Sequence, residues 1–123
     1  MVSDRFVDFY IINEGFYTFT GIQKKLLFNI SNFREMAHKI IYIPILNMPA
    51  TAKTLNLESQ WKNDFFMRDI AAEFLAASAL PQDIIMSADC DEIISYEGFK
   101  RFDPIHDAFA STEMRYFHFY FNR

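Results

Sequence analysis

Three carboxylates fall within four residues at Asp89-Cys90-Asp91-Glu92, directly after the apolar run Asp83–Ala88. Residues two apart in an extended chain point to the same side, so we expect Asp89 and Asp91 to face one way and Cys90 the other. Two such carboxylates can hold a hard divalent cation, directly or through water, and leave positions for phosphate oxygens. The alternative is a solvated surface loop, because Asp-x-Asp is a common chance pattern.

The sequence gives less support to a histidine metal site, a glycine-rich phosphate loop or a cysteine nucleophile. The three histidines are widely separated and lack metal-ligand spacing, so we expect structural roles for them. The three glycines are isolated, which excludes a P-loop and a dinucleotide-binding fingerprint. Cys90 is a poor candidate nucleophile because neighbouring carboxylates disfavour its thiolate form. A phosphate-bearing ligand would therefore depend on a bound metal.

Three apolar runs predict the strands that position this cluster. Phe6–Glu14 is almost continuously apolar and ends in polar residues, as a strand buried on both faces does. Ile40–Leu46 and Asp83–Ala88 predict a second and a third buried strand. Pro44 indicates an edge position or the end of the second strand.

Helices are predicted between the strands. Apolar residues at positions 61, 65, 66, 70, 74, 75 and 79 predict a helix over Gln60–Leu80, which Pro81 ends. Ser31 or Asn32 can cap a short helix that runs to about Lys39. A further short helix is expected over residues 95–101.

This alternation predicts an α/β fold with parallel strands and right-handed crossovers. Ligands of such sheets bind beyond the carboxyl ends of the strands. Two polar clusters follow strand ends, Asn13-Glu14 after the first and the acidic cluster after the third. We therefore expect a ligand site at this edge of the sheet.

Composition narrows the classes of function. The chain has 123 residues, enough for one domain, and 51% of them are hydrophobic. A net charge of -4 argues against a nucleic-acid partner. With one cysteine, no signal peptide and no apolar run long enough for a membrane span, we expect a cytoplasm-like compartment or a fragment of a larger protein.

Several segments together resemble glycosyltransferase family 17, the family of the mannosyl-glycoprotein N-acetylglucosaminyltransferases. They occur in order over nearly the whole chain: VDFYIINEGFYTFTG (7–21), LLF (26–28), HKIIYIPI (38–45), WKNDFFMRDIA (61–71) and DIIMSADCDEI (83–93). The chain departs from the family pattern at Asp69, where Asn is usual, and at Ile94, where Pro is usual.

The resemblance implies a GT-A-like nucleotide-sugar transferase fold, mostly parallel sheet flanked by helices. It implies one domain over residues 1–123, truncated at both ends and holding the donor-binding part only. The implied function is metal-dependent transfer of a sugar from a nucleotide sugar, with UDP-N-acetylglucosamine favoured, to the hydroxyl of a glycan or other acceptor. Asp89 and Asp91 would match the family's metal-binding pair, with Mn2+ or Mg2+ bridging the donor diphosphate.

The resemblance also implies donor-binding residues. Glu14 would help to seat the nucleoside, and Thr20, Gly21 and Lys24 match the turn that follows, where Lys24 would pair with phosphate. Arg68 would reach the donor or the acidic cluster. The alternatives are a solvated strand end for Glu14, a surface lysine for Lys24, and a salt bridge within the helix for Arg68. The catalytic base stays unassigned, because the family's acceptor half follows the region matched here.

Two other functions compete. One is a phosphohydrolase with Asp89 as nucleophile, although Glu92 stands where such enzymes carry Thr or Val. The other is a non-catalytic module that binds the donor or pairs strands with a partner. The aromatic alternation of Met114–Phe121 predicts a strand whose unpaired edge would favour a homo-oligomer. Trp61 and Phe65 are expected in the core.

Overall fold

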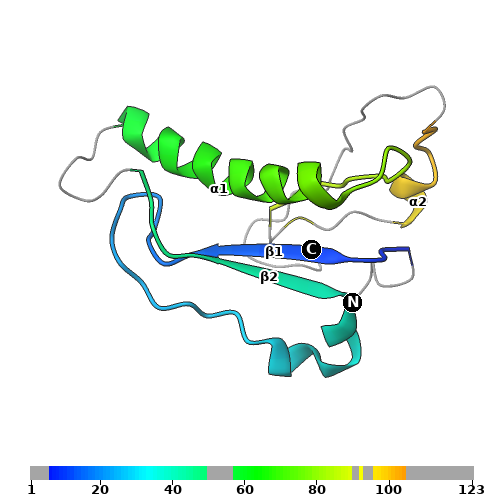
Figure 1. Cartoon of the computed structure of the whole chain (residues 1–123), viewed down its shortest axis with the longest axis horizontal. Helices are drawn as coiled ribbons and strands as arrows, with labels where there is room; N and C mark the ends of the chain where they lie inside the picture. The colour runs from blue at the N-terminus through cyan, green and yellow to red at the C-terminus, as the bar shows by residue number, and fades with distance from the viewer. Residues whose placement is uncertain (1–5, 50–56, 90–91, 93–95, 105–123) are drawn as a thin grey trace, which may run out of the picture. The chain divides into compact units, whose positions relative to one another are not determined.

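The computed structural model describes residues 6–49, 57–89, 92 and 96–104. They fall into two compact units, and each is described by itself. Residues 8–81 form one unit, and the other joins the start of the chain to the part from Gln82 onward. The elements, in chain order, are β1 (Tyr10–Gly15), the 3-10 helix η1 (Ile30–Lys39), β2 (Ile40–Ile45), α1 (Leu57–Ser78) and α2 (Tyr96–Phe99) (Figure 1).

The sheet of the first unit consists of β1 and β2, which pair in parallel from Tyr10↔Ile40 to Gly15↔Ile45. This confirms the predicted α/β class and the parallel pairing of the first two strands. Because side chains alternate along a strand, residues 11, 13 and 15 share one face with 41, 43 and 45. Residues 10, 12, 14, 40, 42 and 44 share the other face.

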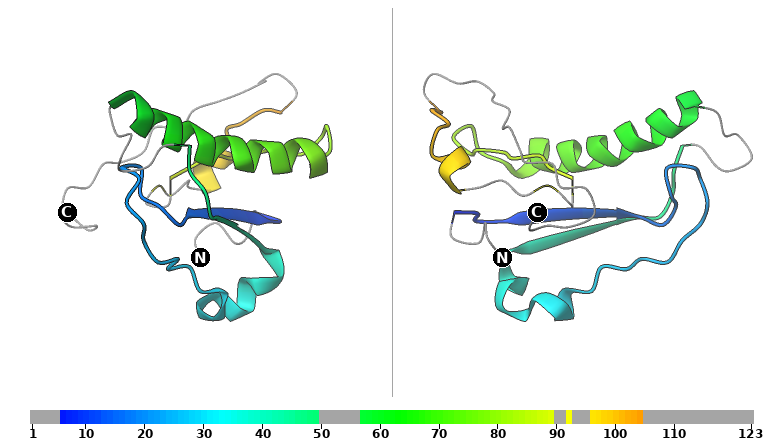
Figure 2. Two further views of the ribbon diagram at one scale, coloured as in Figure 1. Left: turned by 60° about the vertical axis from the view of Figure 1, so that its left-hand side comes forward. Right: turned by 180° about the vertical axis from the view of Figure 1, so that it is seen from behind.

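Helix α1 covers the face that carries Asn13 and Gly15, on the side of the sheet away from η1 (Figures 1 and 2). The side-chain amide of Asn13 donates a hydrogen bond to the Met67 carbonyl at 2.6 Å. A Cβ added at Gly15 would lie 3.1 Å from the Met67 sulfur, so glycine permits this close approach of helix and strand. Ile45 is buried on the same face.

The opposite face is covered by η1 and by the chain that leads to it (Figures 1 and 2). The Phe28 ring lies against Tyr42 of β2, with centroids 4.8 Å apart, and stacks on Phe33 of η1 at 5.5 Å. The N-cap of η1 is Asn29, whose side chain accepts from the Ser31 N–H at 2.9 Å. The prediction of Ser31 or Asn32 as the cap was wrong by two or three positions, because Asn29 already occupies the extended conformation that a cap requires.

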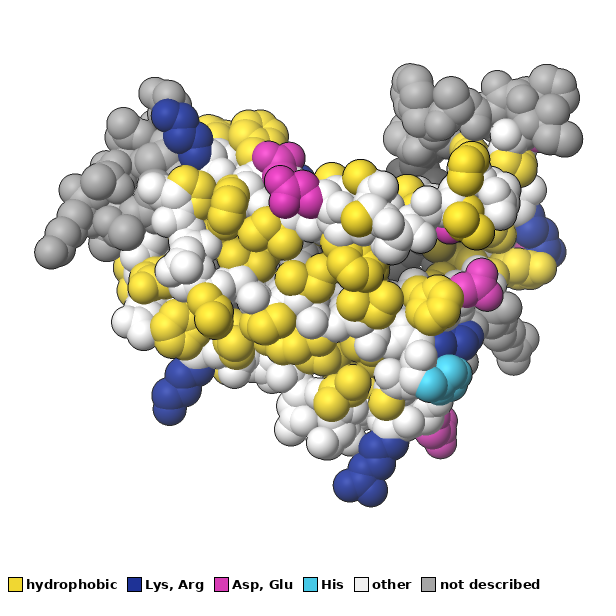
Figure 3. Space-filling model, viewed as in Figure 1, with side chains coloured by type: hydrophobic (Ala, Val, Ile, Leu, Met, Phe, Trp, Pro, Cys, Tyr) yellow, Lys and Arg dark blue, Asp and Glu magenta, His cyan; other side chains and the backbone are white. Residues whose placement is uncertain are grey.

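The prediction that Trp61 and Phe65 lie in the core was wrong. Their exposed fractions are 59% and 57%, and their rings lie 6.3 Å apart on the surface of α1. The face of α1 that meets the sheet instead carries Asn63 and Met67, which contact the turn after β1 and the strand itself. Figure 3 shows the apolar side chains that are left at the surface of the molecule.

The second unit gathers aromatic rings around Phe6. The Phe6 ring stacks on Phe99 at 4.9 Å and lies 5.4 Å from Tyr96, both in α2. Phe6 is therefore not part of the first strand, which begins at Tyr10 rather than at the predicted Phe6. The short α2 confirms a helix within predicted residues 95–101.

The predicted third strand is absent from the described residues 83–89, which adopt no regular secondary structure. Ile84 and Ile85 are exposed there. A strand exists only where its backbone pairs with another strand, and the described sheet consists of β1 and β2 alone. The predicted strand over Met114–Phe121 lies outside the described residues. No helix in the described part of the chain is both long and apolar enough to cross a membrane.

Candidate functional site

The chain reverses direction immediately after β1 through a tight hairpin. The Gly21 N–H donates to the Thr18 carbonyl at 2.8 Å, and the Thr18 N–H donates to the Ile22 carbonyl at 2.8 Å. Gly21 has φ 71°, a left-handed conformation that glycine adopts without the steric cost other residues incur. Lys24 then donates its N–H to the Phe16 carbonyl. This reversal returns Lys24–Phe28, called the 24–28 segment below, past the carboxyl end of β1.

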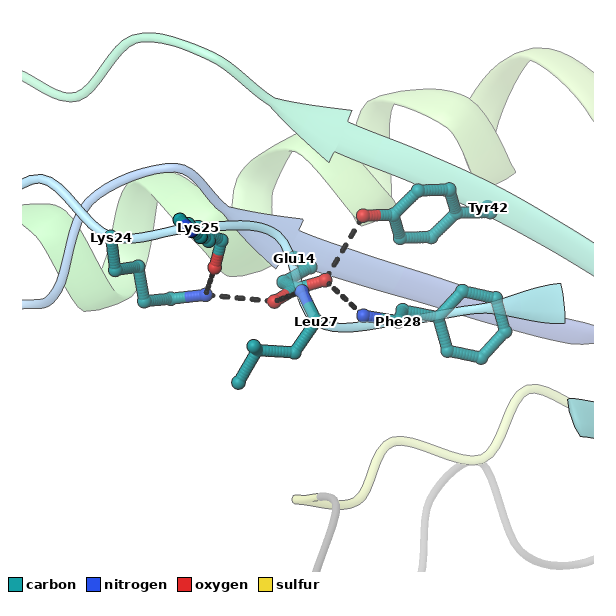
Figure 4. A network of polar contacts seen from close by, with 6 residues as sticks. All are labelled: Glu14, Lys24, Lys25, Leu27, Phe28 and Tyr42. Carbon is teal, nitrogen blue, oxygen red and sulfur yellow. Dashed lines mark hydrogen bonds and ion pairs between the residues drawn. The ribbon is translucent and has the colours of Figure 1, made fainter.

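Glu14 accepts the hydrogen bonds that hold the 24–28 segment beside the end of β1 (Figure 4). Its Oε1 accepts from Lys24 Nζ and from the Leu27 N–H, both at 2.8 Å. Its Oε2 accepts from the Phe28 N–H at 2.9 Å and from the Tyr42 hydroxyl at 3.0 Å. Glu14 faces its partners because residues 12, 14 and 42 share one face of the sheet. One carboxylate thus ties β1, β2 and the 24–28 segment together.

The electrostatics of Glu14 follow from this geometry. Burial alone would raise the pKa of Glu14, since its side chain is only 16% exposed. The hydrogen bonds from Lys24, from two backbone N–H groups and from Tyr42 outweigh burial and lower the pKa of Glu14 from 4.5 to about 2. Burial and the bond to Glu14 raise the pKa of Tyr42. Glu14 is therefore an anion, and Tyr42 a neutral donor, at neutral pH.

The hairpin itself is anchored to α1. Asn63 is fully buried, and its side-chain amide donates to the Phe19 carbonyl at 3.0 Å. The hydroxyls of Thr18 and Thr20 lie 2.8 Å apart, and the Ile22 N–H donates to the Thr18 hydroxyl at 3.1 Å. Thr20 and Gly21, both predicted for the donor site, thus lie in one fixed turn.

The structure brings Glu14 and Lys24 into an ion pair and places Arg68 elsewhere, on the exposed surface of α1. Arg68 Nε pairs with Asp64 Oδ2 at 3.3 Å, one turn away on the same helix. This is the salt bridge that the sequence offered as the alternative to a donor contact. Lys24, with a side chain that is 33% exposed, uses two of its three N–H donors, on Glu14 and on the Lys25 carbonyl at 3.4 Å.

The acidic segment belongs to the other compact unit. The Glu92 N–H donates to the Asp89 carbonyl at 3.0 Å, and the Asp89 N–H donates to Glu92 Oε2 at 2.8 Å. These two bonds close a turn, and the Asp89 side chain is exposed. Asp91 and Cys90 lie outside the described residues. Among the residues that are described, no three His, Cys, Asp or Glu side chains converge on one point.

Sequence reasoning missed Tyr42 and Asn63. Tyr42 stands in an apolar strand, and only the register of β1 against β2 brings its hydroxyl beside Glu14. Asn63 lies between the apolar residues of a helical stripe, on a face that the periodicity assigned to solvent. A polar residue placed on the packed face of a helix is recognised only once its buried partner, here the Phe19 carbonyl, is known.

Comparison with protein families matches residues 3–121 to the model of glycosyltransferase family 17. The match spans nearly all of the chain, and the chain belongs to this family. Comparisons with curated proteins and with solved structures gave no significant match.

Proposed function

We propose that this member of glycosyltransferase family 17 binds a nucleotide sugar and transfers the sugar to an acceptor hydroxyl. The observation that carries the proposal is the family match over residues 3–121. The proposal includes a GT-A-like fold, of which the parallel β1–β2 pair with α1 on one face would be the nucleotide-binding part. UDP-N-acetylglucosamine is the favoured donor and a glycan hydroxyl the favoured acceptor.

In this reaction the bond between the sugar's anomeric carbon and the diphosphate oxygen breaks, and a bond to the acceptor oxygen forms. The acceptor proton passes to a base that we leave unassigned. Negative charge grows on the departing nucleoside diphosphate, so groups that hold positive charge against it favour the transition state. Lys24 and Arg68 are the cations of the proposed donor site, and each has an exposed or part-exposed side chain.

We propose Asp89 and Asp91 as ligands for Mn2+ or Mg2+. The chemistry of the donor set fits, because carboxylate oxygens suit hard divalent cations and the Asp89 side chain is exposed. Glu92 is the less suitable third ligand, since its Oε2 accepts the Asp89 N–H. The cation would supply positive charge to the leaving diphosphate.

The proposed donor contacts follow the sequence prediction. Lys24 would offer its third N–H to a phosphate oxygen, and Arg68 would exchange its exposed pairing with Asp64 for the donor. An exposed helical pair of this kind contributes only about 0.3–0.5 kcal/mol. Thr20 and Gly21 would shape the turn beside the donor, and Glu14 would help to seat the nucleoside.

Calorimetry with Mn2+ and a panel of nucleotide sugars tests the proposal. We expect UDP-N-acetylglucosamine to bind, and Asp89→Asn or Asp91→Asn to abolish the Mn2+-dependent part of binding. Asp8→Asn, which removes the same charge at an exposed position of the other unit, is the matched control. Binding that survives both aspartate variants unchanged would overturn the metal assignment.

Turnover is measured separately, as release of UDP in the presence of a glycan acceptor. Donor binding with acceptor-dependent release of UDP supports the transferase. Donor binding without release would make the chain a donor-binding module instead.

A further inference from the structure

The four hydrogen bonds to Glu14 leave no room for a fifth partner. A carboxylate offers about four lone-pair positions, and all four are filled, two on each oxygen, by donors at 2.8 to 3.0 Å. A nucleoside hydroxyl could approach Glu14 only by displacing one of them. Two of the four are backbone N–H groups, and the part-buried one, that of Phe28, would need a new acceptor.

The donors come from two separate places in the unit, and the acceptor comes from a third. Lys24, Leu27 and Phe28 belong to the 24–28 segment, Tyr42 belongs to β2, and the acceptor Glu14 is the residue before the last of β1 (Figure 4). Leu27 and Phe28 are neighbours in a stretch without regular secondary structure, and their N–H groups both donate to one carboxylate. Without Glu14 these two N–H groups have no acceptor in the described structure. The segment's path past the end of β1 thus depends on this side chain.

Tyr42 complements Glu14 from the other strand. Its hydroxyl donates to Oε2, and its ring lies against Phe28, the residue whose N–H bonds to the same oxygen. Tyr42 therefore holds both the carboxylate and the end of the 24–28 segment. Neither the hydroxyl nor the ring is needed for pairing of β1 with β2, which rests on backbone bonds.

We infer that Glu14 and Tyr42 are positioning residues, which hold the 24–28 segment so that Lys24 presents its remaining N–H to an anionic group at the carboxyl end of β1. Glu14 makes no contact with that group and acts on it through Lys24. The inference rests on the proposed function, in which a phosphate of the nucleotide sugar is the anionic group. It assigns Tyr42 a role in the site and makes the contribution of Glu14 to donor binding an indirect one, through Lys24.

The test compares four variants of the full chain with the wild type. Glu14→Gln keeps the size of the side chain but removes its charge, and Glu14→Asp keeps the charge but shortens the reach. Tyr42→Phe removes one hydroxyl and keeps the ring. Lys25→Gln is the matched control, because it removes a positive charge next to Lys24 from a side chain that the network does not use.

Two quantities are measured for each protein. The first is the amide proton shift of Leu27 and Phe28 without ligand, which reports their bonds to the carboxylate. The second is the dissociation constant of UDP-N-acetylglucosamine with Mn2+, by calorimetry. We expect Glu14→Gln and Glu14→Asp to move both amide resonances upfield and to weaken binding by about tenfold or more. Tyr42→Phe should do both to a smaller extent, and Lys25→Gln should do neither.

Each other outcome has a definite meaning. If Glu14→Gln weakens binding but leaves the amide resonances unmoved, Glu14 acts on the ligand directly, and the inference is overturned. If Glu14→Asp binds as well as the wild type, the charge of Glu14 alone matters, and the inference is again overturned. Moved resonances with unchanged binding would also overturn it, because the segment would then not serve the site. A wild-type chain that binds no nucleotide sugar would overturn the proposed function instead, and the resonances would still decide whether Glu14 holds the segment. If the Glu14 variants fail to fold, the amide shifts and the dissociation constant of Tyr42→Phe are compared with those of the wild type instead.

Discussion

At the scale of single residues, the hydrogen bonds to Glu14 stabilise its charged form in the folded chain. A pKa lowered from 4.5 to about 2 corresponds to roughly 3 kcal/mol of stabilisation at most, and the partial exposure of the side chain reduces this to about 2 kcal/mol. Because the pKa is lower in the folded state, the stabilisation is complete above pH 4.5 and is lost as the pH falls toward 2.

We therefore predict that Glu14→Gln lowers the free energy of unfolding by about 2 kcal/mol at pH 7. The difference from the wild type should stay constant above pH 4.5 and shrink as the pH falls toward 2. Urea unfolding at a series of pH values measures it. Glu73→Gln, which alters an exposed carboxylate of α1, should show no such pH-dependent difference. A difference that grows on acidification would contradict the prediction.

Asn63 gives a second prediction at this scale. It is fully buried and donates to the Phe19 carbonyl, so Asn63→Ala leaves that carbonyl without this donor and opens a small cavity. We expect a loss of about 2–3 kcal/mol in the free energy of unfolding. Asn32→Ala, at an exposed position of η1, is the control and should cost well under 1 kcal/mol. Equal losses in the two variants would argue against the anchoring role.

At the scale of elements, the contact between α1 and β1 depends on the absence of a side chain at Gly15. A Cβ there would lie 2.9 Å from the Tyr17 carbonyl oxygen and 3.1 Å from the Met67 sulfur. We predict that Gly15→Ala costs about 1–3 kcal/mol in the free energy of unfolding. Adding Met67→Ala should recover only part of this loss, because the backbone oxygen cannot move away as the flexible methionine can. Full recovery would assign the whole cost to Met67.

The elements also show what the sequence could predict. The run Ile40–Leu46 predicted β2 to within one residue at each end, because a run so rich in isoleucine favours a strand. The run Asp83–Ala88 looks similar but forms no strand in the described structure. Composition reports that a segment is apolar, whereas a strand also needs a partner whose hydrogen bonds it completes. A strand's partner is distant in the sequence, so the residues of the strand itself do not reveal whether the partner exists.

The buried face of α1 was mispredicted for a related reason. Periodicity gave the helix correctly but placed Trp61 and Phe65 on its buried face. The face of α1 that packs on the sheet is determined by β1, because Asn13 donates a hydrogen bond to the Met67 carbonyl and Gly15 leaves space for the Met67 side chain. Likewise, the sequence predicted Glu14 as a polar residue at the end of a strand, but it did not predict all of the side chains that bond to Glu14. Lys24 reaches it only after the turn at Gly21, and Tyr42 only through the strand register.

At the scale of the whole molecule, the residues with proposed roles fall into both compact units. Glu14, Lys24 and Arg68 belong to the unit of residues 8–81, and Asp89 and Asp91 belong to the other. A ligand that binds only the folded state of one unit raises the stability of that unit.

The chain's single tryptophan gives a prediction about the surface of the first unit. Trp61 is 59% exposed on α1, so acrylamide should quench its fluorescence nearly as well in the folded chain as in urea. The Phe65 ring beside it, 6.3 Å away, covers one side and should reduce the quenching constant modestly. Phe65→Ala should remove that reduction, whereas Phe9→Ala, at an exposed position just before β1, should leave it unchanged. Strong protection of Trp61 that increases with protein concentration would instead mean that a second copy of the chain covers this surface of α1.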